Sequence, residues 1–516
     1  MHLNSAPVPA AHDPSTLPVR WLLATAVASL LLRCWIALTF PISGDEAFFY
    51  WWGVYPDWGY SDHPPMVGWL IALVRSVFGD SIFAIRLPVV LLPLAVGGAL
   101  WWALQPAGRE RAAWAVLFFW LAPLSWLNVL ITTDTPLALW SVLSVAALVR
   151  AERREQLDRA TWGLYALSGL FLGCAFLSKY FSVVLGLAYL VYFAGYRRSR
   201  LAGFALLVAC TLPGPAVNIA YNLSHGWSNI MFNVYNRNQD AVFELRKPLL
   251  YGAMMAYLAT PVALYLAVRH WRTLVATAAR QRLLACLVVV PLLFFALLSA
   301  KKVIGLHWVL SFYPFGFAFL AVALPVHQLR RCAWGLAVFT GLHVLVVFSL
   351  YLTTLDTWRS AALYPQIVRS VKTAEIMRQA SSPDAVLMAD SYTAASIYGF
   401  ERRQYMPVFG PGKFHARQDD VLVDFSVYDG KNLRIITPDK PVLAEFVPYF
   451  AALAVRHFTQ DGVTFYLVDG SGFNYPAYRS SVLGAAYRQF YNIPAWLPMT
   501  GCPFCVRYCG QVRCPR

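Results

Sequence analysis

Residues 83–104 read FAIRLPVVLLPLAVGGALWWAL, an apolar run with a single charged side chain, Arg86. A helix of about 20 apolar residues is long enough to cross a hydrocarbon core of roughly 30 Å. Similar runs recur along the chain, which is 59% hydrophobic and 13% charged, whereas soluble proteins carry about 25% charged residues. The sequence therefore predicts an α-helical protein that crosses a membrane many times.

We expect about 11–13 membrane helices, with ends uncertain by a few residues. Eleven of them can be placed on the sequence as apolar spans at 21–40, 83–104, 112–130, 135–150, 162–178, 180–196, 201–221, 249–268, 283–299, 305–325 and 333–353.

Basic residues indicate the orientation of these spans. Arginines cluster in every second gap, at 109–111, 150–159, 197–200, 269–282 and 330–331, and such loops lie on the cytoplasmic side of a membrane. An odd number of spans then places the C-terminal tail outside. The net charge of +16 follows this pattern, so it indicates membrane orientation and not binding to nucleic acid.

Four regions follow from this pattern. We expect a cytoplasmic segment at 1–20 without a cleavable signal peptide, a transmembrane catalytic domain at 21–353, and a periplasmic α/β domain at 354–516 that ends in a Cys-rich tail. The fourth is an outer juxtamembrane loop within the catalytic domain, at 41–82. Its apolar stretch after Pro64-Pro65 is too short to span and suits a helix lying in the interface.

The last domain has mixed patterns typical of an α/β fold. Runs that resemble strands occur at 385–388, 421–425, 433–436 and 463–468, and helical patterns occur at 361–380 and 441–455.

Charged side chains gather on the predicted outer side of the membrane, where charge at membrane depth is costly and usually functional. They are Asp45, Glu46, Asp62, His63, Asp134, Lys179, His225, Lys301 and Lys302. A lysine can hold a phosphate as a point charge, and a carboxylate can take a proton from an attacking hydroxyl. This combination suits a transferase whose substrate is an anionic lipid.

Several ordered motifs resemble a known family. Ser43-Gly44-Asp45-Glu46-Ala47, Asp57-Trp58-Gly59-Tyr60-Ser61-Asp62-His63-Pro64-Pro65, Thr133-Asp134-Thr135-Pro136, Leu177-Ser178-Lys179-Tyr180, His225-Gly226-Trp227 and Lys302-Val303 with His307-Trp308 occur in that order. They are similar to the GT-C glycosyltransferases, in the bacterial branch related to protein O-mannosyltransferases and to the lipid A aminoarabinose transferase.

The resemblance implies an inverting glycosyltransferase of the cytoplasmic (inner) membrane. It would move a sugar from a polyprenyl-phosphate donor to a lipid, glycan or protein acceptor at the outer face. By the same resemblance, Asp45 is the catalytic base, and the substrate-binding residues are Glu46, Asp62, His63, Asp134, Lys179, His225, Lys302 and His307. No cofactor is certain, but a divalent metal ion is possible because some members of this fold employ one.

Six of these residues also have a purely structural interpretation. Asp45 can cap the helix that follows it, Glu46 can favour the dipole of its first turn, and Asp134 can cap span four. Lys179 and Lys302 can extend their ammonium groups from helix ends toward water, and His225 can lie in a solvated turn.

Four cysteines stand apart at the C-terminus, as Cys502, Cys505, Cys509 and Cys514. Their spacing could hold zinc, but it lacks the paired form of a strong zinc motif. On the outer side of a membrane disulfides are favoured, so disulfides, a metal site and free thiols all remain open.

Two other functions compete with the transferase. A transporter or lipid flippase should carry charges through the midplane of the membrane, whereas these cluster at one edge. A non-catalytic envelope assembly protein would tolerate loss of Asp45.

Overall fold

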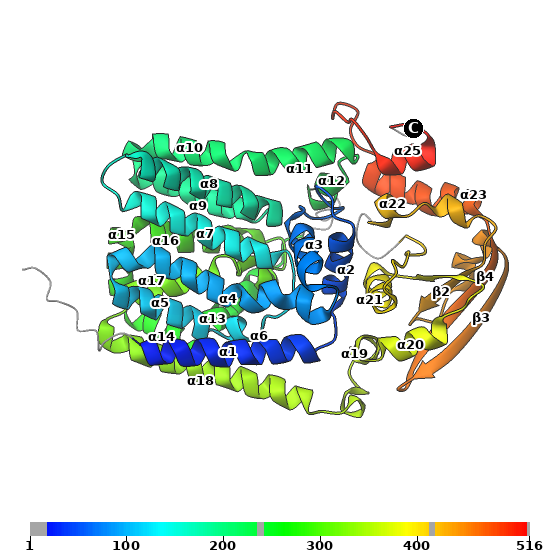
Figure 1. Cartoon of the computed structure of the whole chain (residues 1–516), viewed down its shortest axis with the longest axis horizontal. Coiled ribbons are helices and arrows are strands. Elements are labelled where there is room, and N and C mark those ends of the chain that lie inside the picture. Colours follow the sequence, from blue (N-terminus) through cyan, green and yellow to red (C-terminus); the bar gives the residue numbers. More distant parts are fainter. Residues whose placement is uncertain (1–17, 235–241, 412–417, 513–516) are drawn as a thin grey trace, which may run out of the picture.

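The structure, a computed structural model, describes residues 18–234, 242–411 and 418–512. A bundle of helices forms one half of the molecule, and a small sheet with flanking helices forms the other (Figure 1). Helix α18 runs from the far end of the bundle toward the sheet, so the last helix of the bundle leads directly into the C-terminal domain.

Within the described residues, seven helical segments are long and apolar enough to cross a membrane, or eight if one bent pair is a single span. The seven are α1 (Val19–Thr39), α4 (Ile82–Leu104), α7 (Asp134–Glu152), α8 (Arg159–Ser178), the α10–α11 segment (Arg198–Ser224), α16 (Arg282–Ser299) and α18 (Val326–Tyr351). The bent pair is α13 (Arg246–Ala259) with α14 (Pro261–Arg269), which meet at 95°.

The other predicted spans are shorter helices. They are α5 (Arg109–Leu121) with the single turn α6 (Pro123–Leu127), α9 (Ser182–Tyr196) and α17 (Tyr313–Ala323). Ala122 ends α5 with an extended backbone, because the residue before a proline disfavours the helical conformation. The eleven predicted spans are thus all helical, but three are too short to cross a membrane as single straight helices.

Arg33, a charged residue inside the bundle, is accommodated by backbone carbonyls. It is 2% exposed, and its guanidinium donates to the carbonyls of Val89, Val90 and Ser125. The carbonyl of Val89 lacks a partner within α4 because Pro93, four residues later, has no N–H. Arg33 therefore satisfies one backbone acceptor that proline leaves without a partner, together with two further carbonyls.

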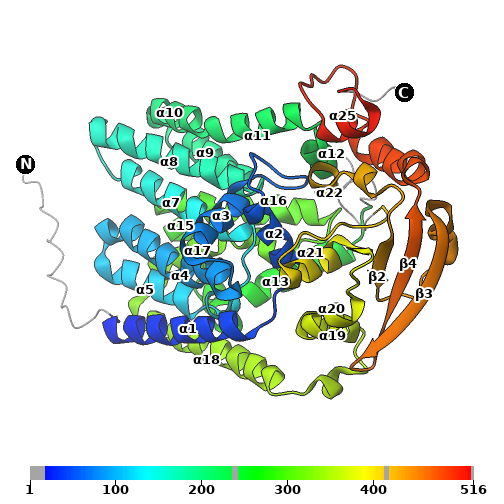
Figure 2. The same cartoon turned by 45° about the vertical axis from the view of Figure 1, so that its right-hand side comes forward.

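Two short helices lie between the bundle and the sheet, namely α2 (Gly44–Val54) and α3 (Met66–Phe78) (Figure 2). Aromatic packing holds the loop between them, since Trp52 stacks on Tyr60 at 4.2 Å between ring centroids. The loop also meets the C-terminal domain, where the Ser61 amide donates to Gln418. The predicted helix after Pro64-Pro65 is therefore present as α3.

The sheet has the order β1-β2-β4-β3. Its strands are β1 (Val386–Ala389), β2 (Leu433–Thr437), β3 (Phe450–Gln460) and β4 (Val463–Phe473). β1 and β2 are parallel, and the other pairs are antiparallel. Helices α19 (Tyr364–Val371), α20 (Thr373–Ala380) and α21 (Tyr392–Arg402) precede or follow β1.

Two predictions for this domain are wrong. Residues 421–425 belong to the turn α22 (Asp419–Leu422) and a 3-10 turn, not to a strand. The second half of the predicted helix at 441–455 is part of β3. The Asp461-Gly462 turn, with φ of 49° and 80°, joins β3 to β4 as a hairpin, and pairing with β4 overrides the local helical pattern.

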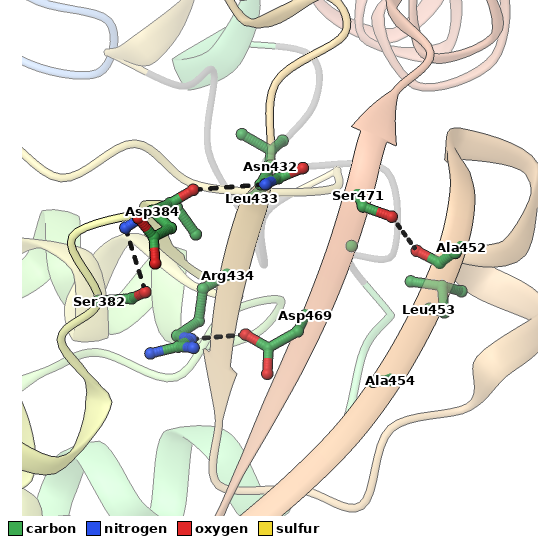
Figure 3. A pocket seen from close by; sticks show the side chains of 12 residues that line it. Ser382, Asp384, Asn432, Leu433, Arg434, Ala452, Leu453, Ala454, Asp469 and Ser471 are labelled. Atoms are coloured by element: carbon green, nitrogen blue, oxygen red, sulfur yellow. Dashed lines mark hydrogen bonds and ion pairs between the residues drawn. The ribbon is translucent and has the colours of Figure 1, made fainter.

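The sheet carries a cavity of about 380 Å³, shown in Figure 3. Two of its charged groups, Arg434 and Asp469, are paired with each other. Arg434 Nε lies 2.5 Å from an Asp469 carboxylate oxygen, and Arg434 also donates to the carbonyls of Ala380 and Ser381. These contacts tie α20 to the sheet, so Arg434 and Asp469 have a structural role in this cavity.

Candidate active site

One cavity of about 910 Å³ lies where the bundle meets the juxtamembrane helices and the C-terminal domain. Seven of the nine side chains predicted for the site line it, namely Asp45, Asp62, His63, Asp134, Lys179, Lys302 and His307. They come from segments far apart in the sequence. Asp134 begins α7, Lys179 follows α8, and Lys302 follows α16. The cavity is therefore at one end of the membrane helices, the end that carries the sheet domain.

The remaining wall is largely apolar. It includes Phe48, Phe49, Phe176, Phe181, Ile230, Leu298, Trp308 and Leu310. Charged groups surrounded by such side chains interact more strongly than in water, so the cavity can hold an ionic headgroup together with apolar substituents.

Asp45 is positioned by a capped helix. The Ser43 hydroxyl accepts from the Glu46 amide, and Glu46 accepts in return from the Ser43 amide, which is a complete capping box. Asp45 lies in the first turn of α2, where the helix dipole favours a carboxylate. Burial raises the pKa of the Tyr392 phenol, and the charges of Asp45 and Asp62 add to the rise. Tyr392, which also lines the cavity, therefore stays protonated beside both carboxylates.

Glu46 does not line the cavity. Its side chain is fully buried and forms two contacts with Arg86, Nε to Oε1 at 2.8 Å and Nη2 to Oε2 at 2.7 Å. The Glu46 carboxylate also accepts from the amide of Ile131. The structure thus gives the Glu46 carboxylate protein donors from Arg86, Ile131 and Ser43, and the predicted substrate contact stays a prediction.

Lys179 and Asp134 form a buried ion pair within the cavity. The ammonium donates to both carboxylate oxygens at 2.8 Å, and the side chains are 11% and 6% exposed. The ammonium also lies 5.4 Å from the centre of the Phe181 ring. Since an ammonium has three donors, one N–H of Lys179 remains for a ligand after Asp134 has taken two.

Asp62 and His63 project from the loop between α2 and α3. His63 Nδ1 lies 3.0 Å from an Asp62 carboxylate oxygen. The Asn233 side chain donates to the carbonyl of Asp62 at 2.8 Å, which connects this loop to α12 (Ser228–Val234). The loop is therefore held from the opposite wall of the cavity.

Further residues complete this polar network, and one of them, Tyr180, stands in the motif Leu177-Ser178-Lys179-Tyr180. The Tyr180 hydroxyl accepts from Asn218 at 2.9 Å and donates to Asn229. Asn229 in turn donates to the carbonyl of Tyr60 at 2.8 Å. Burial raises the pKa of Tyr180, so its hydroxyl remains a proton donor. The tyrosine follows Lys179 directly, and that adjacency was the signal available in the sequence.

His225 lies outside the cavity. Its ring stacks on Tyr221 at 4.0 Å between centroids, and Nε2 lies 3.6 Å from Asp57. Burial lowers the pKa of His225, and the nearby Asp57 partly opposes this. The described contacts of the histidine thus lie within the segment that leads from α11 to α12 and with Asp57, and its role in substrate binding stays a prediction.

The C-terminal tail packs on the same loop. Gly226 donates to the carbonyl of Gly501 at 3.1 Å, and the Trp227 indole donates to the carbonyl of Pro498 at 2.6 Å. Cys502 and Cys505 form a disulfide with 5.2 Å between their Cα atoms. Cys509 is not among the free thiols of the described residues, and Cys514 lies outside those residues.

No group of three or more His, Cys, Asp or Glu side chains that could hold a metal ion occurs among the described residues. The divalent ion considered from the sequence stays a prediction.

Known proteins share both the fold and part of the sequence. Residues 62–213 match the family described as dolichyl-phosphate-mannose-protein mannosyltransferase. A stretch of 186 residues is 28% identical to the lipid A galacturonosyltransferase RgtD of Rhizobium johnstonii (strain DSM 114642 / LMG 32736 / 3841). It covers 35% of this chain and 38% of that relative, so the match spans well under half of the relative's length.

The similarity of structure is more extensive. Crystal structures of ArnT from Cupriavidus metallidurans, in the apo state and bound to undecaprenyl phosphate, match with TM-scores of 0.64 and 0.63 at 15% identity. Each match covers 87% of this chain and 98% of the ArnT chain. The fold expected from the motifs is confirmed, and this multi-pass membrane protein shares the GT-C fold of ArnT.

Proposed function

We propose that this protein is an inverting glycosyltransferase that moves a sugar from a polyprenyl-phosphate donor to an acceptor hydroxyl, with a lipid as the first acceptor to test. The observation that carries the proposal is the single cavity of about 910 Å³, which brings Asp45, Lys179 and Lys302 together from distant parts of the chain. The ArnT structure bound to undecaprenyl phosphate and the lipid A galacturonosyltransferase supply the substrate classes to test first.

The two lysines would hold the donor phosphate. Lys179 has one ammonium N–H left after its two bonds to Asp134, and Lys302 faces the same cavity. Charge-assisted hydrogen bonds to a phosphate are the strong ones. Asp134 would act indirectly, since it keeps the Lys179 ammonium in one position.

Asp45 would act as the base. The acceptor oxygen attacks the anomeric carbon, the bond from that carbon to the phosphate oxygen breaks, and the acceptor proton passes to the Asp45 carboxylate. Attack from the face opposite the phosphate inverts the anomeric centre. The phosphate leaves as an anion, so Lys179 and Lys302 would stabilise the charge that develops on it.

The donor chain requires an apolar path beside the site. A cavity of about 490 Å³ is lined by α13, α14, α16 and α17, and includes Leu292, Val309 and Phe312. Val309 directly follows Trp308, which lines the active-site cavity. We assign this apolar cavity to the first isoprenoid units of the donor.

The proposed location is the bacterial cytoplasmic (inner) membrane, with the C-terminal domain in the periplasm. Arg330 and Arg331 lie near the start of α18, at the end of the bundle far from the sheet (Figure 1). Since arginine-rich ends stay cytoplasmic, this arrangement supports a site that opens to the periplasm.

A flippase remains the alternative, but the position of the charges favours an enzyme. The Asp134–Lys179 pair lies at the ends of α7 and α8 and not along their length. A transport pathway would need polar groups through the midplane.

Replacement of Asp45 by asparagine tests the proposal. Membranes containing the variant are incubated with a labelled undecaprenyl-phosphate sugar and lipid A, and transfer is followed by thin-layer chromatography. Loss of the base should reduce transfer by about 100-fold or more. Asp57→Asn is the matched control, because Asp57 is an outer carboxylate that does not line the cavity. Full transfer by a folded Asp45→Asn protein would overturn the assignment.

The sugar and the acceptor are open within this proposal. A panel of donors with hexose, uronic acid and aminopentose headgroups, each offered with lipid, glycan and peptide acceptors, identifies both from the product mass.

A further inference from the structure

A second polar cavity, of about 750 Å³, lies on the C-terminal domain close to the active site. It is formed where β1 and β2 end and where the segment after α18 crosses them. Asp390 and Ser391 follow β1, Lys440 follows β2, and Arg369 comes from α19. Ligands of open α/β sheets bind outside the carboxyl ends of parallel strands, which is where this cavity is found.

Two cations of this cavity, Arg369 and Lys440, have side chains that form no hydrogen bond or ion pair among the described residues. The Nε atom of Arg369 is buried, and Lys440 is exposed. The contrast with the cavity in Figure 3 is direct, because Arg434 and Asp469 pair there with each other. Buried polar groups in proteins nearly always have partners, so Arg369 calls for an acceptor supplied from outside.

An acceptor of hydrogen bonds lies in the same cavity. One carboxylate oxygen of Asp390 accepts from the Thr437 hydroxyl at 2.8 Å. The other is buried and has no hydrogen-bond partner among the described residues. A ligand for this cavity must therefore bring an anionic group for the two cations and a hydroxyl or amine for Asp390. A phosphorylated sugar has both.

Consecutive residues at the start of α21 line this cavity and the proposed reaction site. Ser391 lines the second cavity, and Tyr392, the next residue, lines the active-site cavity. The first turn of α21 also touches the start of α2, since a Cβ atom added at Gly44 would lie 2.3 Å from the Thr393 methyl group. Gly44 directly precedes Asp45, so the first turn of α21 connects Ser391, which lines the second cavity, with the segment that carries the proposed base.

The cavity also lies close to the membrane boundary. α18 ends at Tyr351, and Arg359, which lines the cavity, follows eight residues later. The neighbouring Leu352 and Leu363 are 68% and 60% exposed. Such apolar side chains next to a polar cavity suit a ligand that is itself anchored in the membrane.

We propose that this cavity binds the phosphorylated sugar headgroup of the acceptor lipid, with Arg369 and Lys440 on the phosphate and Asp390 on a sugar hydroxyl or amine. The inference rests on the proposed transferase function and identifies its acceptor class. In this arrangement the headgroup is held at one point while another of its hydroxyls reaches the cavity that contains Asp45.

The test measures binding to the full-length protein in phosphatidylcholine nanodiscs. Lipid A is the probe, phosphatase-treated lipid A is the comparison, and native mass spectrometry counts the bound lipid. Arg369→Gln should weaken binding of lipid A by 10-fold or more, because charge-assisted hydrogen bonds are lost. Lys440→Gln should weaken it by about 3-fold or more, and this exposed side chain can be replaced without loss of folding.

Lys372→Gln is the matched control. Lys372 follows α19, lies 3.8 Å from Glu375 and does not line the cavity, so lipid A binding should be unchanged. The proposal is overturned if Arg369→Gln and Lys440→Gln bind lipid A like the wild type, or if dephosphorylated lipid A binds equally well. Inorganic phosphate that displaces lipid A at equal concentration would indicate a plain anion site and would also overturn it.

The outcome is separable from that of the transferase assay. Binding that depends on Arg369 without transfer from any donor would support the headgroup site and count against the enzyme. Transfer that does not depend on Arg369 or Lys440 would support the enzyme and count against the headgroup site.

Discussion

Replacement of Glu46 by glutamine removes the carboxylate that neutralises Arg86 inside the protein. Arg86 is fully buried and uses its remaining N–H groups on the carbonyls of Ala37, Phe40 and Pro41 at 2.9 to 3.0 Å. Those carbonyls lie where α1 ends and the chain turns toward α2. The ion pair therefore holds the segment that presents Asp45.

The expected loss of stability follows from the burial of both groups. Removing one partner of a buried ion pair costs about 3–5 kcal/mol, because the other charge is left uncompensated in a medium of low polarity. A glutamine amide group would, in addition, point an N–H at existing donors, since Glu46 also accepts from the amides of Ser43 and Ile131. Exchange of both members for apolar residues should cost less than the sum of the single exchanges.

The assay separates stability from substrate binding. Thermal unfolding of the purified variant in detergent should begin several degrees below that of the wild type. In the fraction that stays folded, the KM for the donor should remain close to the wild-type value, because Glu46 does not reach the cavity. Asp45→Asn is the comparison, with near-normal stability and little transfer.

An opposite pattern would refute the structural role. If Glu46→Gln melts like the wild type and raises the KM for the donor by 10-fold or more, then Glu46 contacts substrate, as the family resemblance implied.

Three further predictions test other parts of the structure. Lys179→Gln should raise the donor KM by about 10-fold, because one charge-assisted hydrogen bond to phosphate is lost; an unchanged donor titration would contradict this. Arg33→Met should lower the melting temperature through unsatisfied carbonyls in the membrane, each costing about 1–3 kcal/mol, and equal melting curves would count against it. Burial alone would raise the pKa of Asp469, but hydrogen bonds from Arg456 and Arg434 lower it overall. A depressed folded pKa stabilises the protein above the unfolded value near 3.9, so Asp469→Asn should melt earlier than the wild type at pH 7, and the difference should shrink below about pH 4.

Much of the membrane region could be predicted because its determinants are local. Apolar runs and arginine-rich gaps report directly on the cost of placing charge in lipid, and all eleven predicted spans are helical. The structure of the C-terminal domain was harder to predict from the sequence. Residues 450–455 form part of a strand because β4 pairs with them. The helical pattern of residues 441–455 gives no sign of that pairing, because the partner strand lies elsewhere in the sequence.

The site likewise has a part that the sequence predicted and a part that it could not predict. Motifs at Asp45, Asp134 and Lys179 identified side chains that meet in one cavity, since charge at membrane depth is rarely incidental. Neighbours in sequence could not be separated by the same reasoning. Asp45 faces the cavity while Glu46 faces Arg86, because successive residues of a helix point about 100° apart.

The sequence by itself determined that the chain is a many-span membrane protein with its candidate site residues at one edge and its arginine clusters at the other, because hydropathy and charge act on each segment separately. Tertiary structure alone decided which charges are partners. Lys179 is bound to Asp134 and Glu46 to Arg86, whereas Arg369 and Asp390 keep polar atoms without partners among the described residues. Such differences arise from contacts between segments far apart in the chain, and these exist only after the chain has folded.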